Sequence, residues 1–338
     1  MQSDLENAHL GFSDDLLSTL CAPPRRRQRG LAPWATWESE NASLGKTFRE
    51  WARFPKFLPI FICSDHGVHW ESRCWENEID SKYSTFFTWN FKKSLKMRDS
   101  HGKNSFHVTH PWVHYRKKKF GDPKIERSGT LVYFPHSNST TSPTFKDLDL
   151  YITQLLRLPS KFHPVVLCLM SHDVEKGLHE NLRHYGIPIV TAGNTSSANF
   201  VDNFYSLLYQ FKYATSPASL PLGSHAYYVL EAGIPFFLFG EGISYSIAGS
   251  ISVKDGELDL NDYGDSEDIN RMLNFKASLI LPRDEVSEAQ RRTTEDYLGV
   301  NAQMSRIFAA WILWKSLFTN LGEFAGLYLK EIRSLLQK

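Results

Sequence analysis

The chain has 338 residues, 42% of them hydrophobic and 22% charged, and its formal net charge is only +1. This composition is typical of an ordinary globular protein, and the length favours two domains over one. The nearly neutral charge argues against a nucleic-acid partner. Two local basic runs, residues 25–29 and 116–119, leave a peripheral contact with anionic lipid open, the alternative being that both are solvated loops.

The cysteines and the apolar segments indicate the compartment. The four cysteines have no metal-ligand spacing and are typical of free thiols in a reducing compartment. The first residues are acidic and polar, unlike a signal peptide. Charged and polar residues interrupt the late apolar stretch 307–329, whose apolar positions recur at helical spacing, so we predict an amphipathic helix and no membrane span. We therefore expect a cytoplasmic protein, with peripheral contact at the inner membrane left open.

In the first third of the chain, three predicted strands end in polar residues. A short helix is expected near residues 45–54, and a buried strand over residues 57–63 runs into Ser64, Asp65, His66 and Gly67. Further strands are predicted at residues 85–89 and 105–109. In open α/β sheets, ligands bind at the carboxyl ends of the strands, so this edge is a candidate site.

From Gly129 onward, strands and helices alternate regularly. Strands are predicted over residues 130–134, 165–170 and 188–191, and helices over residues 145–156, 174–185 and 200–210. The loops after these strands are rich in Ser, Thr, Asn, His and Gly, which is typical of a polar ligand cleft. The alternation predicts a parallel, doubly wound sheet with right-handed crossovers.

Residues 212–241 carry the strongest signal for a ligand. A short strand ends at Ala214, a polar loop with small side chains follows, and a helix is expected from Ser224 to Ala232. Gly233 stops that helix, and residues 234–239 form a buried strand. Because a helix N-terminus presents backbone N–H groups and a positive dipole end, this corner suits a phosphate.

The last part of the chain holds fewer signals. The acidic stretch 255–268 is interpreted as an insertion or surface loop, and residues 287–297 predict a polar helix. The amphipathic helix 307–329 closes the chain.

These features resemble the GT-B glycosyltransferases of bacterial surface-polysaccharide biosynthesis. The resemblance covers residues 58–338 and is strongest at residues 223–239, where a Ser/Gly turn precedes a helix, the letters GIP and a strand; His66-Gly67 after the first strand is similar too. It implies an α/β fold of two Rossmann-like domains with a long C-terminal amphipathic helix crossing back. The implied parts are an acceptor domain (residues 1–125), a nucleotide-sugar domain (126–300) and a helix that packs back on the first domain (301–338).

The resemblance also implies an activity, the transfer of a sugar from a nucleotide-activated donor to a glycan or glycolipid acceptor. The nucleotide sugar is a co-substrate, and no other cofactor is expected. Tyr228 occupies the place where many enzymes with uridine donors have a ribose-binding Glu, and the nearest acid is Glu231. The pairs His110-Pro111 and His163-Pro164 resemble the cytidine-nucleotide motif of bacterial sialyltransferases. Together these features favour a CMP-linked donor.

Glycosyl transfer needs a base and a grip on the departing nucleotide. His66 is the candidate base, oriented by Asp65; the alternative is that Asp65 caps a turn and His66 packs. The remaining candidates contact the nucleotide, the alternative for each loop being ordinary turn polarity. They are Gly223, Ser224 and His225 for the phosphate, Ser137, Asn138 and Ser139 opposite them, Ser171 and His172 for the nucleobase or ribose, and Glu231 for the ribose.

No metal site is predicted. Asp147 and Asp149 match a metal-binding DxD, but acids in the first turn of a helix are explained by the helix dipole. The histidines of residues 101–114 fit no common zinc spacing and are expected on polar surface or at the acceptor site. Two other functions stay open: a nucleotide-sugar epimerase or polyol-phosphate transferase of the same fold, and a non-catalytic GT-B-like binding protein.

Overall fold

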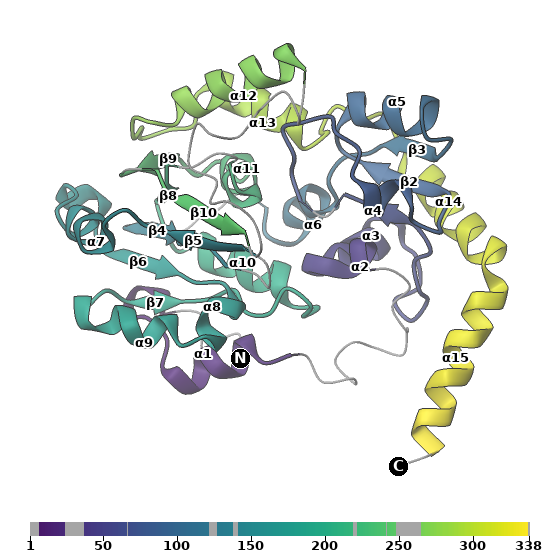
Figure 1. The fold of residues 1–338 in the computed structure, drawn as a ribbon, viewed down its shortest axis with the longest axis horizontal. Helices are drawn as coiled ribbons and strands as arrows, with labels where there is room; N and C mark the ends of the chain where they lie inside the picture. The colour runs from purple at the N-terminus through teal and green to yellow at the C-terminus, as the bar shows by residue number, and fades with distance from the viewer. Residues whose placement is uncertain are drawn as a thin grey trace. The chain divides into compact units, whose positions relative to one another are not determined.

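The computed structural model describes residues 7–23, 37–65, 67–121, 127–137, 141–218, 222–240, 242–247 and 265–336. The chain is α/β and divides into two compact units (Figure 1). Unit 1 comprises Met1–Pro23, Phe120–Asn194 and Asn199–Thr294, and unit 2 comprises Pro24–Lys119, Thr195–Ala198 and Glu295–Lys338. The C-terminal helices thus belong to unit 2, together with most of the first third of the chain.

Unit 1 is built on a five-stranded, fully parallel sheet, as the alternation predicted. The order across the sheet is β7-β6-β4-β8-β9 (Figure 1). The strands are β4 (Thr130–Tyr133), β6 (Val165–Cys168), β7 (Ile189–Val190), β8 (Tyr213–Pro217) and β9 (Phe236–Phe239). The first of them in the chain, β4, lies at the centre, because the chain builds outward to β7 and then crosses over to β8.

The helices of unit 1 are α1 (Asp14–Cys21), α7 (Leu148–Leu156), α8 (Ser171–Glu175), α9 (Leu178–Leu182), α10 (Phe200–Leu208), α11 (Ser224–Glu231), α12 (Ser266–Ser278) and most of α13 (Glu288–Tyr297). An antiparallel pair that the sequence analysis missed, β5 (Thr141–Thr144) with β10 (Ser244–Ile247), forms a second small sheet. One part of the core beside the main sheet is aromatic, with Phe162, Tyr213 and Phe237 packed together.

Three boundaries in unit 1 differ from the predicted ones. The helix expected at 174–185 is broken by Gly177, whose φ of +79° is open to glycine but costly for other residues. The strand expected to end at Ala214 instead begins at Tyr213 and continues to Pro217, because Thr215 to Pro217 pair with β9. The acidic stretch 255–268 is partly helical: Asp265 caps α12, whereas residues 255–264 lie outside the described residues.

Unit 2 holds a three-stranded parallel sheet in the order β1-β2-β3. The strands are β1 (Cys63–Ser64), β2 (Thr85–Thr88) and β3 (Asn104–His107). The helices of this unit are α2 (Trp37–Glu40), α3 (Leu44–Ala52), α4 (Glu76–Ile79), α5 (Phe91–Asp99), α6 (Pro111–Lys119), α14 (Arg306–Thr319) and α15 (Leu321–Leu336). Cys63, Phe86 and Met97 form a core between the sheet and α5.

Two expectations for unit 2 were wrong in extent. The predicted strand 57–63 pairs only at Cys63 and Ser64, because the N–H of Leu58 closes a turn on Pro55 and Pro59 has no N–H to donate. Burial of residues 60–62, not ladder pairing, explains the apolar run. The single helix expected over 307–329 is two helices, which meet at Asn320 with non-helical φ and ψ of −116° and 27°.

Candidate functional site

The carboxyl edge of the unit 1 sheet contains a topological switch point. After β4 the chain proceeds to β6 on one side, whereas β8 lies on the other side of β4. In open α/β sheets, ligands bind at the carboxyl ends of the strands at such a switch point. Of the predicted residues, Ser137 follows β4 and Gly223 follows β8, and Ser224 and His225 are the first two residues of α11.

An aromatic stack joins the end of β4 to the start of α11. The rings of Tyr133 and His225 are stacked, with centroids 4.7 Å apart and an interplanar angle of 22°, and Phe236 packs 5.7 Å from the same His225 ring. Burial, with a smaller contribution from His136, lowers the pKa of His225 to about 3. His225 is therefore neutral near pH 7, and its uncharged ring packs the end of β4 against the start of α11.

Gly223 is the N-cap of α11 and, as a glycine, contributes no capping side chain. It has ordinary extended φ and ψ of −67° and 149°. A Cβ atom at this position would lie 2.5 Å from Cε1 of His225, so a side chain there would collide with the packed ring. The absence of a side chain at Gly223 thus lets the His225 ring pack against the beginning of α11.

The loop after β4 is tied to the loop after β6. The N–H and hydroxyl of Ser137 both donate to Oδ1 of Asp173, at 3.1 and 2.6 Å, and Nζ of Lys176 donates to Oγ of Ser137 at 3.1 Å. Lys176 is exposed at the end of α8, so it adds a solvent-facing cation to this edge. The sequence analysis missed Lys176, because a lysine at the end of a short helix carries no distinguishing signal.

The other residues predicted to contact the nucleotide do not all lie at this edge of the sheet. Ser171 is buried at the start of α8, and the neighbouring His172 is 41% exposed with Nδ1 4.0 Å from Glu175. Glu231 is the last residue of α11, about 10 Å along the helix axis from Ser224 at 1.5 Å per residue, and so is not brought to the same edge. Asn138 and Ser139 lie outside the described residues.

Tyr228, which stands where an acid was expected, belongs to the core of unit 1. It is 7% exposed, and its ring meets Phe204 edge-on with centroids 5.9 Å apart. Burial raises its pKa well above the ordinary range of a phenol. The aromatic residue at this position therefore packs the helix against α10.

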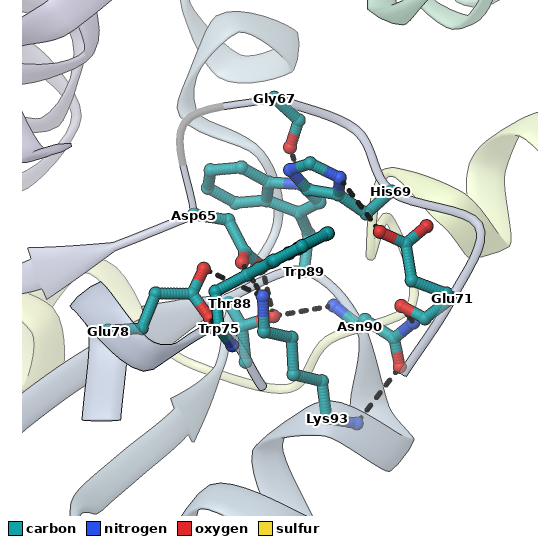
Figure 2. Close-up of polar contacts among 10 residues, drawn as sticks. All are labelled: Asp65, Gly67, His69, Glu71, Trp75, Glu78, Thr88, Trp89, Asn90 and Lys93. Atoms are coloured by element: carbon teal, nitrogen blue, oxygen red, sulfur yellow. Dashed lines mark hydrogen bonds and ion pairs between the residues drawn. The ribbon is translucent and has the colours of Figure 1, made fainter. Parts of the chain in front are cut away.

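The carboxyl edge of the unit 2 sheet carries a buried charge cluster around Asp65, and His66 lies outside the described residues. Nζ of Lys93, on α5, lies 2.5 Å from Oδ1 of Asp65 and 2.8 Å from Oε1 of Glu78, and all three side chains are at most 1% exposed (Figure 2). The hydroxyl of Thr88, at the end of β2, also donates to Asp65. The Asp65 carboxylate thus pairs with Lys93 and accepts a hydrogen bond from Thr88.

The three charges of this cluster perturb one another. Burial raises the pKa of Asp65, but the charges of Lys93 and His69 and the hydrogen bonds from Lys93 and Thr88 together outweigh it, so the net pKa lies below its ordinary value. Burial and then the charge of Asp65 raise the pKa of Glu78 to about 7. The two carboxylates raise the pKa of Lys93 against the effect of burial, so the lysine stays charged. The cluster therefore holds one cation between an ionised aspartate and a glutamate that titrates near neutrality.

We expect stability to report the titration of Glu78. Because its pKa rises from 4.5 to about 7 on folding, the folded protein binds this proton more tightly, and stability falls as pH rises between these values. The Glu78→Gln variant should lose this slope, on the order of 2 kcal/mol across the window. Urea unfolding at a series of pH values measures it.

The exposed Glu76 on the same helix supplies the control for this experiment. The Glu76→Gln variant should keep the wild-type slope. His69 also has a raised pKa, and its stabilisation is lost as pH rises through that value, but this contribution is shared by all three proteins and cancels in the comparison. Equal slopes in the wild type and the Glu78→Gln variant would show that Glu78 titrates in its ordinary range.

A second polar pair follows on the loop after β1. Nδ1 of His69 lies 3.2 Å from Oε1 of Glu71, and the two side chains are 22% and 5% exposed (Figure 2). His69 was not among the predicted site residues. A histidine two residues before a glutamate in a loop is the signal that could have found the pair.

Asp147 and His110, for which a metal site was not predicted, have structural roles. Asp147 is the N-cap of α7 and accepts from the N–H of Leu150 at 2.8 Å, as the helix-dipole interpretation expected. His110, expected on a polar surface or at the acceptor site, is instead fully buried with its ring 4.2 Å from Trp89. Within the described ranges, no group of three or more His, Cys, Asp or Glu side chains could hold a metal ion.

Comparisons with known proteins add no family assignment. No protein-family model matches this chain, and no curated protein matches it either. In the part of the chain that the structure describes, no helix combines the length and apolar character needed to cross a bilayer.

Proposed function

We propose that the protein is a glycosyltransferase of the GT-B type, which transfers a sugar from a nucleotide-activated donor to a glycan or glycolipid acceptor. One observation carries the proposal: at the switch point of the unit 1 sheet, α11 meets the end of β4 through the stack of Tyr133 on His225, and Lys176 contacts Ser137 on the loop after β4. A helix N-terminus and a lysine at this edge of the sheet suit the diphosphate or phosphate of a nucleotide.

In this proposal, the leaving nucleotide is held without a metal. The N–H groups of the first turn of α11 bind the departing phosphate, and Lys176 supplies a positive charge as negative charge develops on that phosphate. Ser171 and His172 lie at the end of β6, next to β4, and serve the nucleobase or ribose. Because Tyr228 is packed in the core, the ribose is held without a glutamate at that position, which favours a CMP-linked donor over the commonest uridine donors.

The GT-B assignment rests on the two parallel α/β units. Unit 2 would hold the acceptor, and the helices α14 and α15 at the end of the chain group with that unit, as the resemblance implies. The exposed side chains of Ile307, Trp311 and Phe318 on α14 offer an apolar surface for peripheral contact with the inner membrane, where a glycolipid acceptor would be presented on the cytoplasmic side.

Release of nucleotide tests the proposal. The full chain is incubated with CMP- and UDP-sugars, with and without a mixture of polysaccharide and glycolipid acceptors, and free nucleotide is measured. Acceptor-dependent release supports a transferase, whereas turnover without an acceptor indicates an epimerase. Nucleotide binding by thermal shift without any turnover indicates a binding protein, and neither shift nor release with any donor would refute the proposal.

Lys176 gives a residue-level check of the phosphate site. We expect the Lys176→Met variant to bind CMP or UDP about three- to tenfold more weakly, a modest loss because solvent screens an exposed charge. Isothermal titration at low and physiological salt measures the affinities. Lys161, which is 51% exposed and precedes β6 at the opposite edge of the sheet, supplies the control. Equal weakening by the Lys161→Met variant would argue against a local role for Lys176.

A further inference from the structure

Unit 2 has a pocket beside β3, the edge strand of its sheet. The pocket has a volume of about 700 Å³ and lies between α5, β3, residues 301–305 and the start of α14 (Figure 1). Every residue that lines it belongs to unit 2, and no member of the charge cluster around Lys93 is among them. Its volume is in the range of small-molecule sites.

Aromatic side chains form the apolar part of this pocket. Phe91 is 59% exposed and Phe308 is 43% exposed. Phe91 meets the ring of His107 edge-on, with centroids 5.6 Å apart and an interplanar angle of 68°, and Phe308 meets Phe106 at 5.9 Å and 76°. Because the rings of each pair are steeply inclined, neither pair offers two parallel faces to a flat nucleobase. The exposed ring faces suit the C–H groups of a saturated ring.

Two buried hydroxyls lie where α5 meets β3. Oγ of Ser94 and Oγ of Ser105 are 3.1 Å apart, and these residues are 3% and 4% exposed. Each hydroxyl has one hydrogen to donate, and the bond between them uses only one of the two. Among the described residues, neither hydroxyl has a further partner. Because a buried donor without an acceptor is costly, the pocket favours a ligand that brings an oxygen to this pair.

The charge of the pocket comes from one arginine. Among the described residues that line it, Arg98 alone is charged at pH 7, and its contact with the exposed Asp99 is a surface pair of 3.5 Å at Nε. Burial lowers the pKa of His107, whose neutral ring donates from Nε2 to the carbonyl of Trp89 at 3.2 Å. The pocket therefore suits a ligand with a single negative charge.

Two side-chain amides complete the polar lining. Gln303 is exposed and has no hydrogen-bond partner among the described residues, whereas Asn301 donates to Oδ1 of Asp296 at 3.2 Å. An amide side chain both donates and accepts hydrogen bonds, as the hydroxyl group of a ligand does. These groups therefore match a ligand with several hydroxyls.

We propose that this pocket binds a sugar ring that carries a carboxylate, such as a uronic acid unit of a glycan. Arg98 binds the carboxylate, for which the planar guanidinium offers two parallel N–H groups. The amides and the serine pair bind hydroxyls, and Phe91 and Phe308 contact the C–H faces of the ring. One cation matches one carboxylate better than a phosphate monoester, which carries nearly two charges. This binding goes beyond the proposed transfer activity and does not depend on it.

Matched probes separate the contributions of the hydroxyls and the carboxylate. The methyl glycosides of glucuronic and galacturonic acid carry both, those of glucose and galactose lack the carboxylate, and cyclohexanecarboxylate lacks the hydroxyls. Saturation-transfer NMR with the full chain measures each dissociation constant. We expect at least one uronide to bind with a Kd on the order of 1 mM, and its uncharged counterpart and cyclohexanecarboxylate to bind at least about fivefold more weakly.

Three results with these probes would overturn the inference. Equal binding of a uronide and its uncharged counterpart would show that the carboxylate is not recognised. Equal binding of cyclohexanecarboxylate would indicate a site for apolar acids in general. Failure of both uronides to bind at concentrations up to about 20 mM would show that no such sugar site exists.

Substitutions then locate the binding. Phe91→Ala should weaken uronide binding about fivefold or more, and Phe308→Ala repeats this test from α14 in case the first variant disturbs α5. Phe57→Ala is the control, since Phe57 is 57% exposed and lies in unit 2 outside the pocket. Arg98→Gln should abolish the preference for the uronide, whereas Arg292→Gln, at a 75% exposed arginine of unit 1, should keep it. Uronide binding that survives the changes at Phe91, Phe308 and Arg98 would lie elsewhere and would refute the assignment.

These assays need no turnover, so their outcome is separate from that of the transferase proposal. If no donor releases nucleotide but the uronide binds at Arg98, the transfer activity fails and the sugar site stands. If nucleotide is released but neither uronide binds, the transfer activity stands and the sugar site fails.

Discussion

The Gly223→Val variant is expected to lose at least about tenfold in affinity for CMP or UDP, which corresponds to about 1.4 kcal/mol. Backbone strain is not the cause, because the φ of Gly223 is −67° and suits any residue. The cause is collision: a Cβ atom would sit 2.5 Å from Cε1 of His225, whose ring is packed between Tyr133 and Phe236. The added side chain must push the ring aside or occupy the space in front of the first turn of α11. Isothermal titration measures the loss.

A control substitution tests whether replacing a glycine with valine lowers nucleotide affinity wherever it is introduced. Gly322 lies in α15, in unit 2, and a Cβ atom there meets nothing within 4 Å. The Gly322→Val variant should bind nucleotide as the wild type does. Undiminished affinity in the Gly223→Val variant, with its fold intact by circular dichroism, would place the nucleotide away from the N-terminus of α11.

For the Lys93→Met variant we expect the free energy of unfolding to fall by about 3–5 kcal/mol at pH 7.5. The methionine fills much of the same space, but it leaves the carboxylates of Asp65 and Glu78 buried without their cation. Because Lys93 is fully buried, solvent cannot replace the lost charge. The loss should shrink at pH 5, where Glu78 is protonated in the folded protein. Urea unfolding followed by fluorescence measures both values.

Lys96, one turn further along α5, is exposed and donates to Oγ of Ser72 at 2.7 Å. The Lys96→Met variant should therefore change stability by no more than about 1 kcal/mol. Combining Lys93→Met with Asp65→Asn and Glu78→Gln removes every charge of the cluster and should recover part of the stability. A Lys93→Met variant as stable as the Lys96→Met variant would show that the cluster is not closed to water.

Much of the unit 1 fold could be predicted from periodicity. Continuous apolar runs marked β4 and β6, and the polar residues after them marked the loops, because strands buried on both faces need apolar residues throughout. The apolar run over residues 57–63 was predicted to be a strand for a related reason. A buried segment also consists of apolar residues, but only hydrogen bonds to a neighbouring strand make it a β-strand. Pairing depends on a partner far away in the chain, so the β5–β10 pair was missed as well.

The candidate site was predictable where a local rule applied. A glycine before a helix, at Gly223, is a local signal for an open helix end, and Asp147 before α7 is a local signal for a cap. Lys176 carries no such signal, since its place at the site depends on its contact with Ser137, and the two-residue spacing of His69 and Glu71 is only a weak one. Asp65 is the opposite case. The sequence suggested it as a partner for His66, whereas in the folded protein its carboxylate pairs with Lys93.

By itself, the sequence determined the α/β class, the alternation of unit 1 and the glycine-started helix α11, because these depend on the periodicity and backbone preferences of neighbouring residues. Only the tertiary structure decided that β4 lies at the centre of its sheet, that Tyr133 stacks on His225, and that Lys93 sits between two carboxylates. Strand order, stacking and ion pairing bring together residues distant in the chain, and their energies depend on burial that no local stretch of sequence contains.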